Sequence, residues 1–146
     1  MIRPIEEKDR AKYLSMAHKF YHSDAVLQSV PDSYFEKTFD QILVNSPFVL
    51  GYILEKNGKT CGYALLARSW SQEAGGEVIW LEELFVLPEA RGKGLGNEFL
   101  DFLHASFENT VKRFRLEVEE ENTGAIRLYK QKGFEFFSYD QMKKDL

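Results

Sequence analysis

Residues 84–97 limit the possible folds of this chain most strongly, because the apolar pattern changes period within them. The first four residues read as the end of a strand, and glycines at positions 92, 94 and 96 precede a run of apolar residues at helical spacing. Each glycine costs a helix up to about 1 kcal/mol relative to alanine, so a functional reason is expected. The start of a helix offers free backbone amides and a partial positive charge, which bind phosphate groups. With Arg91 and Lys93 beside it, this turn is predicted to bind an anion.

Two better-known phosphate-binding loops do not fit this segment. The chain contains no G-x-x-x-x-G-K-[ST] motif, and a G-x-G-x-x-G motif would require a glycine where Phe99 stands. A nucleotide triphosphatase and a Rossmann dehydrogenase are therefore disfavoured. The alternative to an anion site is a turn whose glycines only allow the strand to meet the helix.

The rest of the chain alternates predicted strands with predicted helices, without a linker, repeat or low-complexity tract. Their order is β-α-α-β-β-β-α-β-α-β. The strands are expected at residues 2–5, 47–56, 60–70, 77–87, 114–119 and 134–137, and the helices at about residues 8–21, 31–43, 95–109 and 122–132. Asn57-Gly58 tolerates the positive φ angles of a type I′ hairpin. Hairpins in the middle with helical crossovers at both ends predict a mixed α/β sheet.

Composition fits one domain over residues 1–146. The 44% of hydrophobic residues can supply a core for a chain of this length. The 19 lysines and arginines against 23 aspartates and glutamates give a net charge of −4 without a basic run, which argues against nucleic acid as a partner. No apolar stretch approaches the roughly 20 residues of a membrane span, and the acidic start is unlike a secretory signal. We therefore expect a cytoplasmic protein without a membrane partner.

The sequence offers little for metal or thiol chemistry. Cys61 is the only cysteine, which excludes an internal disulfide and a multi-thiolate zinc site, and it is expected to be a small buried hydrophobe. His18 and His22 are four residues apart and could face one way on a helix, but no carboxylate stands at ligand spacing. No metal is expected.

Two motifs together make the chain resemble the GNAT superfamily of acyl-CoA-dependent N-acetyltransferases. Arg91-Gly92-Lys93-Gly94-Leu95-Gly96 matches that family's pyrophosphate motif [Q/R]-x-x-G-x-[G/A], after a strand that ends in Val-x-Pro. Residues 122–134 are similar to the family's N-x-x-A-x-x-L-Y-x-x-x-G-F segment. The element order is also that of the family, so the resemblance spans the chain. The first forty-five residues support it through the order of their elements more than through a motif. The resemblance implies the GNAT fold.

The resemblance also implies acetyl-CoA as the cosubstrate. The backbone of the strand before the turn would bind the pantetheine arm, and the amides of the turn would hold the pyrophosphate. Asn122 would contact the pantetheine where the fourth and fifth strands separate. The implied cofactor-binding residues are Leu84, Phe85, Val86, Arg91, Gly92, Lys93, Gly94, Leu95, Gly96, Asn122, Ala125 and Tyr129.

Three residues are candidates for the chemistry that the resemblance implies. Tyr129 would protonate the departing thiolate, and its alternative role is to pack an amphipathic helix on the sheet. Glu82 or Glu83 would accept the proton of the amine, directly or through water, and both could instead be solvated strand carboxylates. Strand alternation sends the two glutamates to opposite faces. Glu82 is favoured, because some polyamine-type family members carry a carboxylate at the matching place.

The acceptor site is expected in the family's usual specificity region, where Tyr21, His22 and Trp70 combine aromatic rings with polar groups. Acidic residues at positions 117 and 119–121 could attract a cationic amine, or form a solvated strand end. The predicted function is transfer of an acetyl group to a primary amine of a small molecule or peptide in a ternary complex. The alternative is a non-catalytic acyl-CoA-binding module. The aromatic residues at 134–139 could support a homodimer.

Overall fold

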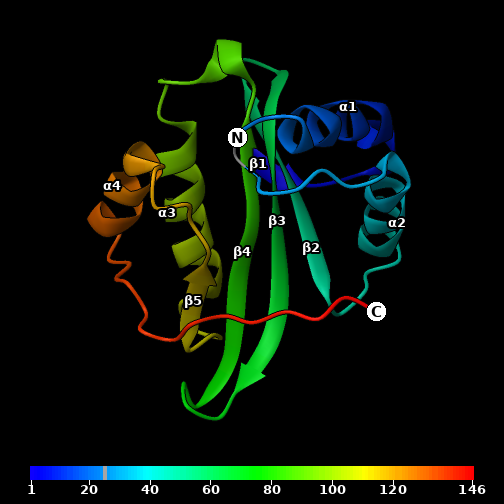
Figure 1. Cartoon of the computed structure of the whole chain (residues 1–146). Helices are drawn as coiled ribbons and strands as arrows, with labels where there is room; N and C mark the ends of the chain where they lie inside the picture. Colours follow the sequence, from blue (N-terminus) through cyan, green and yellow to red (C-terminus); the bar gives the residue numbers. More distant parts are fainter. Residues whose placement is uncertain (25) are drawn as a thin grey trace.

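The computed structural model describes residues 1–24 and 26–146 and contains a five-stranded sheet with helices on both faces (Figure 1). The strands are β1 (Ile2–Pro4), β2 (Val49–Lys56), β3 (Lys59–Ser71), β4 (Gly76–Val86) and β5 (Arg113–Leu116). The α-helices are α1 (Arg10–Tyr21), α2 (Asp32–Leu43), α3 (Leu95–Phe107) and α4 (Thr123–Gln131), and two 3-10 turns are η1 (Glu7–Asp9) and η2 (Pro88–Ala90). None of the described helices is long and apolar enough to cross a membrane.

The sheet follows the chain order β1-β2-β3-β4-β5, with antiparallel pairs from β1 to β4 and a parallel pair between β4 and β5. This confirms the predicted mixed α/β sheet. The predicted hairpin between β2 and β3 is also confirmed, because Asn57 and Gly58 both have positive φ, at 52° and 72°. Such angles match the twist of the two flanking strands.

A β-bulge interrupts the long pairing of β3 with β4. Leu65 pairs with Glu83 and the next residue, Leu66, pairs with Leu81, so Glu82 is the extra residue of β4. A bulge of this kind changes the direction of the side chains around it and bends the strand. It lies in the middle of the sheet, where the candidate carboxylates are.

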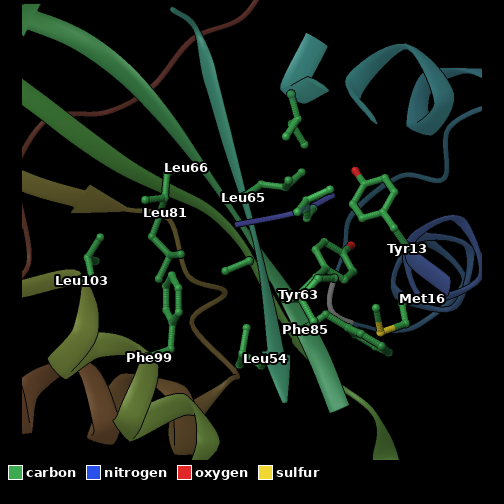
Figure 2. Close-up of a cluster of buried hydrophobic side chains, with 14 of the residues drawn as sticks. Tyr13, Met16, Leu54, Tyr63, Leu65, Leu66, Leu81, Phe85, Phe99 and Leu103 are labelled. Carbon is green, nitrogen blue, oxygen red and sulfur yellow. The ribbon is translucent and has the colours of Figure 1, made fainter. Parts of the chain in front are cut away.

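The core fills both faces of the sheet (Figure 2). On the side of α1, the Tyr13 ring packs edge-on against the Tyr63 ring of β3, with 5.1 Å between centroids. On the opposite side, Phe99 and Leu103 of α3 are buried near Leu81 of β4 (Figure 2). Because both faces are covered, the strands are largely apolar, and a charged side chain among them needs a specific reason.

The predicted last strand at residues 134–137 is wrong. Residues 134–146 have no regular secondary structure and run across the lower part of the sheet in Figure 1. Phe136 is 70% exposed, with Lys130 Nζ 5.1 Å from its ring. Phe137 lies under the guanidinium groups of Arg113 and Arg115, at 5.0 and 4.9 Å. The aromatic pattern therefore serves cation–π contacts rather than a strand ladder.

Candidate functional site

The parallel pairing of β4 with β5 covers only part of β4. Residues 78–81 pair with Arg113–Leu116, and β5 then ends, although it was expected to continue to residue 119. Residues 83–86 therefore pair with β3 on one side, and neither they nor the bulge residue Glu82 has a strand on the other side among the described residues. Their backbone groups on that side are available to an extended ligand, which can add to a sheet edge like another strand.

The glycine turn follows this open edge directly. Gly92 and Gly94 have φ of 70° and 82°, and Gly94 is the N-cap of α3. The first hydrogen bond of the helix runs from the Glu98 amide to the Gly94 carbonyl, at 2.9 Å, and none of the described side chains caps this end. The amides just before Glu98 therefore have no intrahelical acceptor, as an anion site at a helix start requires.

Three basic side chains donate hydrogen bonds to backbone carbonyls in or next to this turn. Arg91 Nε donates to the Val86 carbonyl at 3.0 Å, and Lys93 Nζ donates to the Glu89 carbonyl at 3.1 Å. Lys56 Nζ, from the end of β2, donates to the Lys93 carbonyl at 3.0 Å. Sequence reasoning missed Lys56, because nothing local connects the end of β2 with the turn. These contacts place positive charge around the turn without filling it.

Helix α4 packs against the start of α3. A Cβ at Gly96 would lie 3.3 Å from Leu128 Cδ2, so glycine at this position allows the two helices to approach. The Asn122 side chain caps α4 by accepting a hydrogen bond from the Ala125 amide at 3.3 Å. This contact makes Asn122 the N-cap of α4, and the packing of Leu128 against Gly96 brings the two sequence motifs next to each other.

Tyr129 lies on α4, partly buried, with its ring 5.8 Å from that of Phe134. Burial raises the pKa of its phenol, and the hydroxyl makes no hydrogen bond to another described residue. A phenol with a raised pKa is protonated at neutral pH and can serve as a proton donor to a departing thiolate.

Glu82 is the bulge residue and is exposed to solvent. Its carboxylate makes no hydrogen bond or ion pair with another described residue. Partial burial of the carboxyl, followed by the negative charges of Glu117 and Glu83, raises its pKa. An accessible carboxylate with a raised pKa is suited to accepting a proton.

Glu83 has a different environment, because two phenols donate hydrogen bonds to its carboxylate. The Tyr63 hydroxyl donates to Oε2 at 2.7 Å, and the Tyr21 hydroxyl donates to Oε1. The pKa of Glu83 is raised, because burial raises it more than the hydrogen bonds from Tyr21 and Tyr63 lower it. The bulge thus leaves one glutamate open to solvent and turns its neighbour inward.

The other two residues predicted to bind the amine acceptor, His22 and Trp70, lie at different distances from the Glu83 carboxylate. His22 follows Tyr21, is exposed, and stacks on His18 with 4.0 Å between ring centroids. Trp70 is 78% exposed and lies toward the far end of β3, about 23 Å along the strand from Tyr63 at ~3.3 Å per residue. The structure therefore brings Tyr21 to the carboxylates but does not bring Trp70 there.

Tyr63 is a site residue that the sequence analysis missed. It is fully buried on β3, and in the sequence it is one apolar member of a strand pattern, like many core tyrosines. Only the pairing of β3 with β4 places it against Glu83. Within the described part of the chain, no group of three or more His, Cys, Asp or Glu side chains is arranged to hold a metal ion.

Comparison with known proteins places these features in a family. The sequence model of the acetyltransferase (GNAT) family matches residues 13–134. An uncharacterized N-acetyltransferase of Methanocaldococcus jannaschii is 37% identical over 58% of this chain and 38% of its own length. A spermine/spermidine N(1)-acetyltransferase of Bacillus subtilis is 34% identical over 54% of this chain and 55% of its own. The chain thus spans about half, or less, of these curated relatives.

A crystal structure of a predicted acetyltransferase with acetyl-CoA from Clostridium acetobutylicum has the same fold, with a TM-score of 0.79 and 18% identity over 99% of this chain and 95% of that one. The motifs, the element order and the family match over most of the sequence agree. This chain belongs to the acetyltransferase (GNAT) family.

Proposed function

We propose that this protein transfers the acetyl group of acetyl-CoA to a primary amine by direct attack in a ternary complex. The observation that carries the proposal is the continuity of two binding features. The open edge of β4 at residues 82–86 leads within a few residues into the free amides at the start of α3. An extended thioester arm with a diphosphate at its end matches this sequence of features.

The cosubstrate would be held mainly by backbone. The edge groups of Leu84, Phe85 and Val86 would bind the pantetheine arm, and the amides from Arg91 to Gly96 would bind the diphosphate. Asn122 and Ala125 lie at the start of α4, which packs against the start of α3. Family membership and the solved neighbour with acetyl-CoA support this choice of cosubstrate.

Glu82 and Tyr129 would carry the two proton transfers. Glu82 would remove a proton from the ammonium through a bound water, and the free amine would then form the new C–N bond at the acetyl carbonyl carbon. A β4 amide would stabilise the oxyanion that develops. When the C–S bond breaks, Tyr129 would give its proton to the departing thiolate, and the resulting phenolate would take up the proton that the newly bonded nitrogen loses as the neutral amide forms. The chain itself forms no covalent bond in this scheme.

The charge around the site favours a positively charged acceptor. Glu82, Glu83 and Glu117 lie close enough for their charges to affect one another, and no ion pair involves any of them among the described residues. Such a group of carboxylates attracts cations. One relative is named for spermine and spermidine, which are cationic amines. The acceptor would be a cationic primary amine of a small molecule or a peptide.

A coenzyme-release assay tests this proposal. The protein is mixed with acetyl-CoA and, in separate reactions, with putrescine, spermidine, a lysine-containing peptide and a neutral alcohol of similar length. Release of coenzyme A that requires both acetyl-CoA and an amine is expected. Binding of acetyl-CoA without release for any amine would instead favour a non-catalytic acyl-CoA-binding module.

We also propose that two copies associate through the late part of the chain. The outer edge of β5 has no strand partner among the described residues, and the aromatic side chains of Phe136, Phe137 and Tyr139 are exposed. Both features support an interface there. Sedimentation equilibrium of the protein and of a Phe136→Ser variant would test it: a dimer that this substitution weakens is expected, and a monomer at all concentrations would contradict it.

A further inference from the structure

The carboxylate of Glu83 is held from two different elements. Tyr63 reaches it from β3, with 2.7 Å between the phenol oxygen and Oε2, and Tyr21 reaches Oε1 from the last turn of α1. Each carboxylate oxygen therefore has its own donor. Hydrogen bonds to an ionised group are shorter and stronger than those between neutral groups, so this arrangement fixes the orientation of the carboxylate.

The charge of Glu83 is not balanced inside the protein. The titratable groups that face it are Tyr13 and Tyr21 on α1, Tyr63 on β3 and Glu82 on β4, and none of them is a cation. Among the described residues, no lysine, arginine or histidine forms an ion pair with it. Removing a carboxylate from water without a counter-ion is costly, and two phenols offset only part of the cost. The described residues therefore leave the charge of Glu83 without a counter-ion.

The position of Glu83 indicates which counter-ion it would meet. Glu83 follows the bulge residue Glu82 and precedes Leu84, so it lies within the open part of β4 where the proposed transfer takes place. The acceptor of that reaction arrives as an ammonium ion. We infer that Tyr63 and Tyr21 are positioning residues that hold Glu83 as a fixed anion for a positive charge of the acceptor amine. This inference rests on the proposed function.

The two phenols differ in how firmly they are held. Tyr63 is fully buried, and its ring packs on Tyr13 and Phe85 at centroid distances of 5.1 and 5.8 Å. Tyr21 is only partly buried and ends α1, with its ring 5.2 Å from that of Phe35. Tyr63 therefore sets the position of the carboxylate, and Tyr21 connects it to the segment between α1 and α2.

A titration of the Glu83 carboxyl tests the inference without relying on turnover. The protein is labelled with 13C at the glutamate side-chain carboxyls, and Glu83→Gln identifies the Glu83 signal. Tyr63→Phe and Tyr21→Phe each remove a donor that favours the anion, so each is expected to raise the Glu83 pKa. Tyr52→Phe is the matched control, because Tyr52 is a partly buried phenol that packs toward α3 on the other face of the sheet. Saturating putrescine is expected to lower the Glu83 pKa in the unaltered protein.

Kinetics with the best amine of the panel supply the second readout. Tyr63→Phe is expected to raise the KM for the amine at least about tenfold while leaving the KM for acetyl-CoA unchanged, because it weakens only the acceptor anion. Tyr21→Phe serves as the second variant if Tyr63→Phe lowers the melting temperature. The inference is overturned if both variants match Tyr52→Phe in titration and KM, or if putrescine leaves the Glu83 pKa unchanged. A protein that shows the titration shifts but releases no coenzyme A would contradict the proposed function alone.

Discussion

Gly62 on β3 lies directly against the Phe85 backbone of β4, so that a Cβ at position 62 would collide with the Phe85 carbonyl oxygen. The close approach occurs in the part of β4 whose other edge is open, and it fixes that part of the strand against the sheet. The colliding atom belongs to the backbone and cannot move aside as a flexible side chain could.

We therefore expect Gly62→Ala to lower the free energy of unfolding by more than about 2 kcal/mol. Gly124→Ala is the control, since Gly124 lies in α4 with open space around it, and alanine there should stabilise the helix by up to about 1 kcal/mol. Urea denaturation of both variants measures the difference. Equal stability of Gly62→Ala and the unaltered protein would show that β3 and β4 do not approach as described.

The buried Asp9 carboxyl is expected to make the free energy of unfolding depend on pH. It is 5% exposed and accepts hydrogen bonds from Arg3 Nη1 and Nη2, at 2.8 and 2.9 Å, and from the Glu6 amide. The Arg3 hydrogen bonds lower the pKa of Asp9, more than burial raises it. A carboxyl whose pKa is lowered in the folded state stabilises the protein at pH values above its ordinary pKa, near 3.9. This contribution is lost as the pH falls through the folded-state pKa.

Asp9→Asn is accordingly expected to lower the free energy of unfolding by about 3 kcal/mol at neutral pH, because the Arg3 guanidinium loses one of its two carboxylate partners and keeps only Glu55. The difference between variant and unaltered protein should shrink below about pH 4. Chemical denaturation at a series of pH values checks both statements. A difference that stays constant down to about pH 2 would mean that Asp9 is not the group that titrates.

Local patterns made much of the fold predictable, because they depend on neighbouring residues. Asn57-Gly58 determines its turn by backbone conformation alone, and the glycines of residues 92–96 mark the change from strand to helix. The family motifs added the expectation of acetyl-CoA as the cosubstrate, which composition alone could not have indicated.

Contacts between distant residues were not predictable in the same way. The aromatic alternation at residues 134–137 looks like a strand, but Phe137 is held by Arg113 and Arg115 from another element. Tyr63 is likewise an ordinary strand residue until the pairing of β3 and β4 places it beside Glu83. Strict alternation also cannot anticipate the bulge that separates the environments of Glu82 and Glu83.

Tyr129→Phe tests whether the Tyr129 phenol donates the proton to the departing thiolate. The substitution keeps the ring that packs on Phe134 and removes the phenolic proton, so turnover should fall by about 100-fold or more while the affinity for acetyl-CoA stays the same. Tyr139→Phe, at an exposed tyrosine that hydrogen-bonds Glu73, is the control and should leave both quantities unchanged. An undiminished rate in Tyr129→Phe would eliminate the phenol as the proton donor.

The titration of Glu82 is expected to produce the acidic limb of the pH–rate profile. A base works only when deprotonated, so kcat/KM should rise with pH through the raised pKa of Glu82. Glu82→Gln should remove this limb and lower the rate by about 100-fold or more. Glu117→Gln removes a negative neighbour that raises the Glu82 pKa, so it should shift the limb to lower pH without abolishing it. A limb that neither substitution changes would assign the base elsewhere.

A thermal-shift measurement tests whether acetyl-CoA binds at the start of α3. Acetyl-CoA at about 100 times its Kd should raise the melting temperature of the unaltered protein by roughly 5–10 °C. Gly94→Glu places a negative side chain at the free amides and should abolish this shift. Gly75→Glu has the same backbone strain, at φ 84° in the turn between β3 and β4, and should retain it. A full shift in Gly94→Glu would contradict the account.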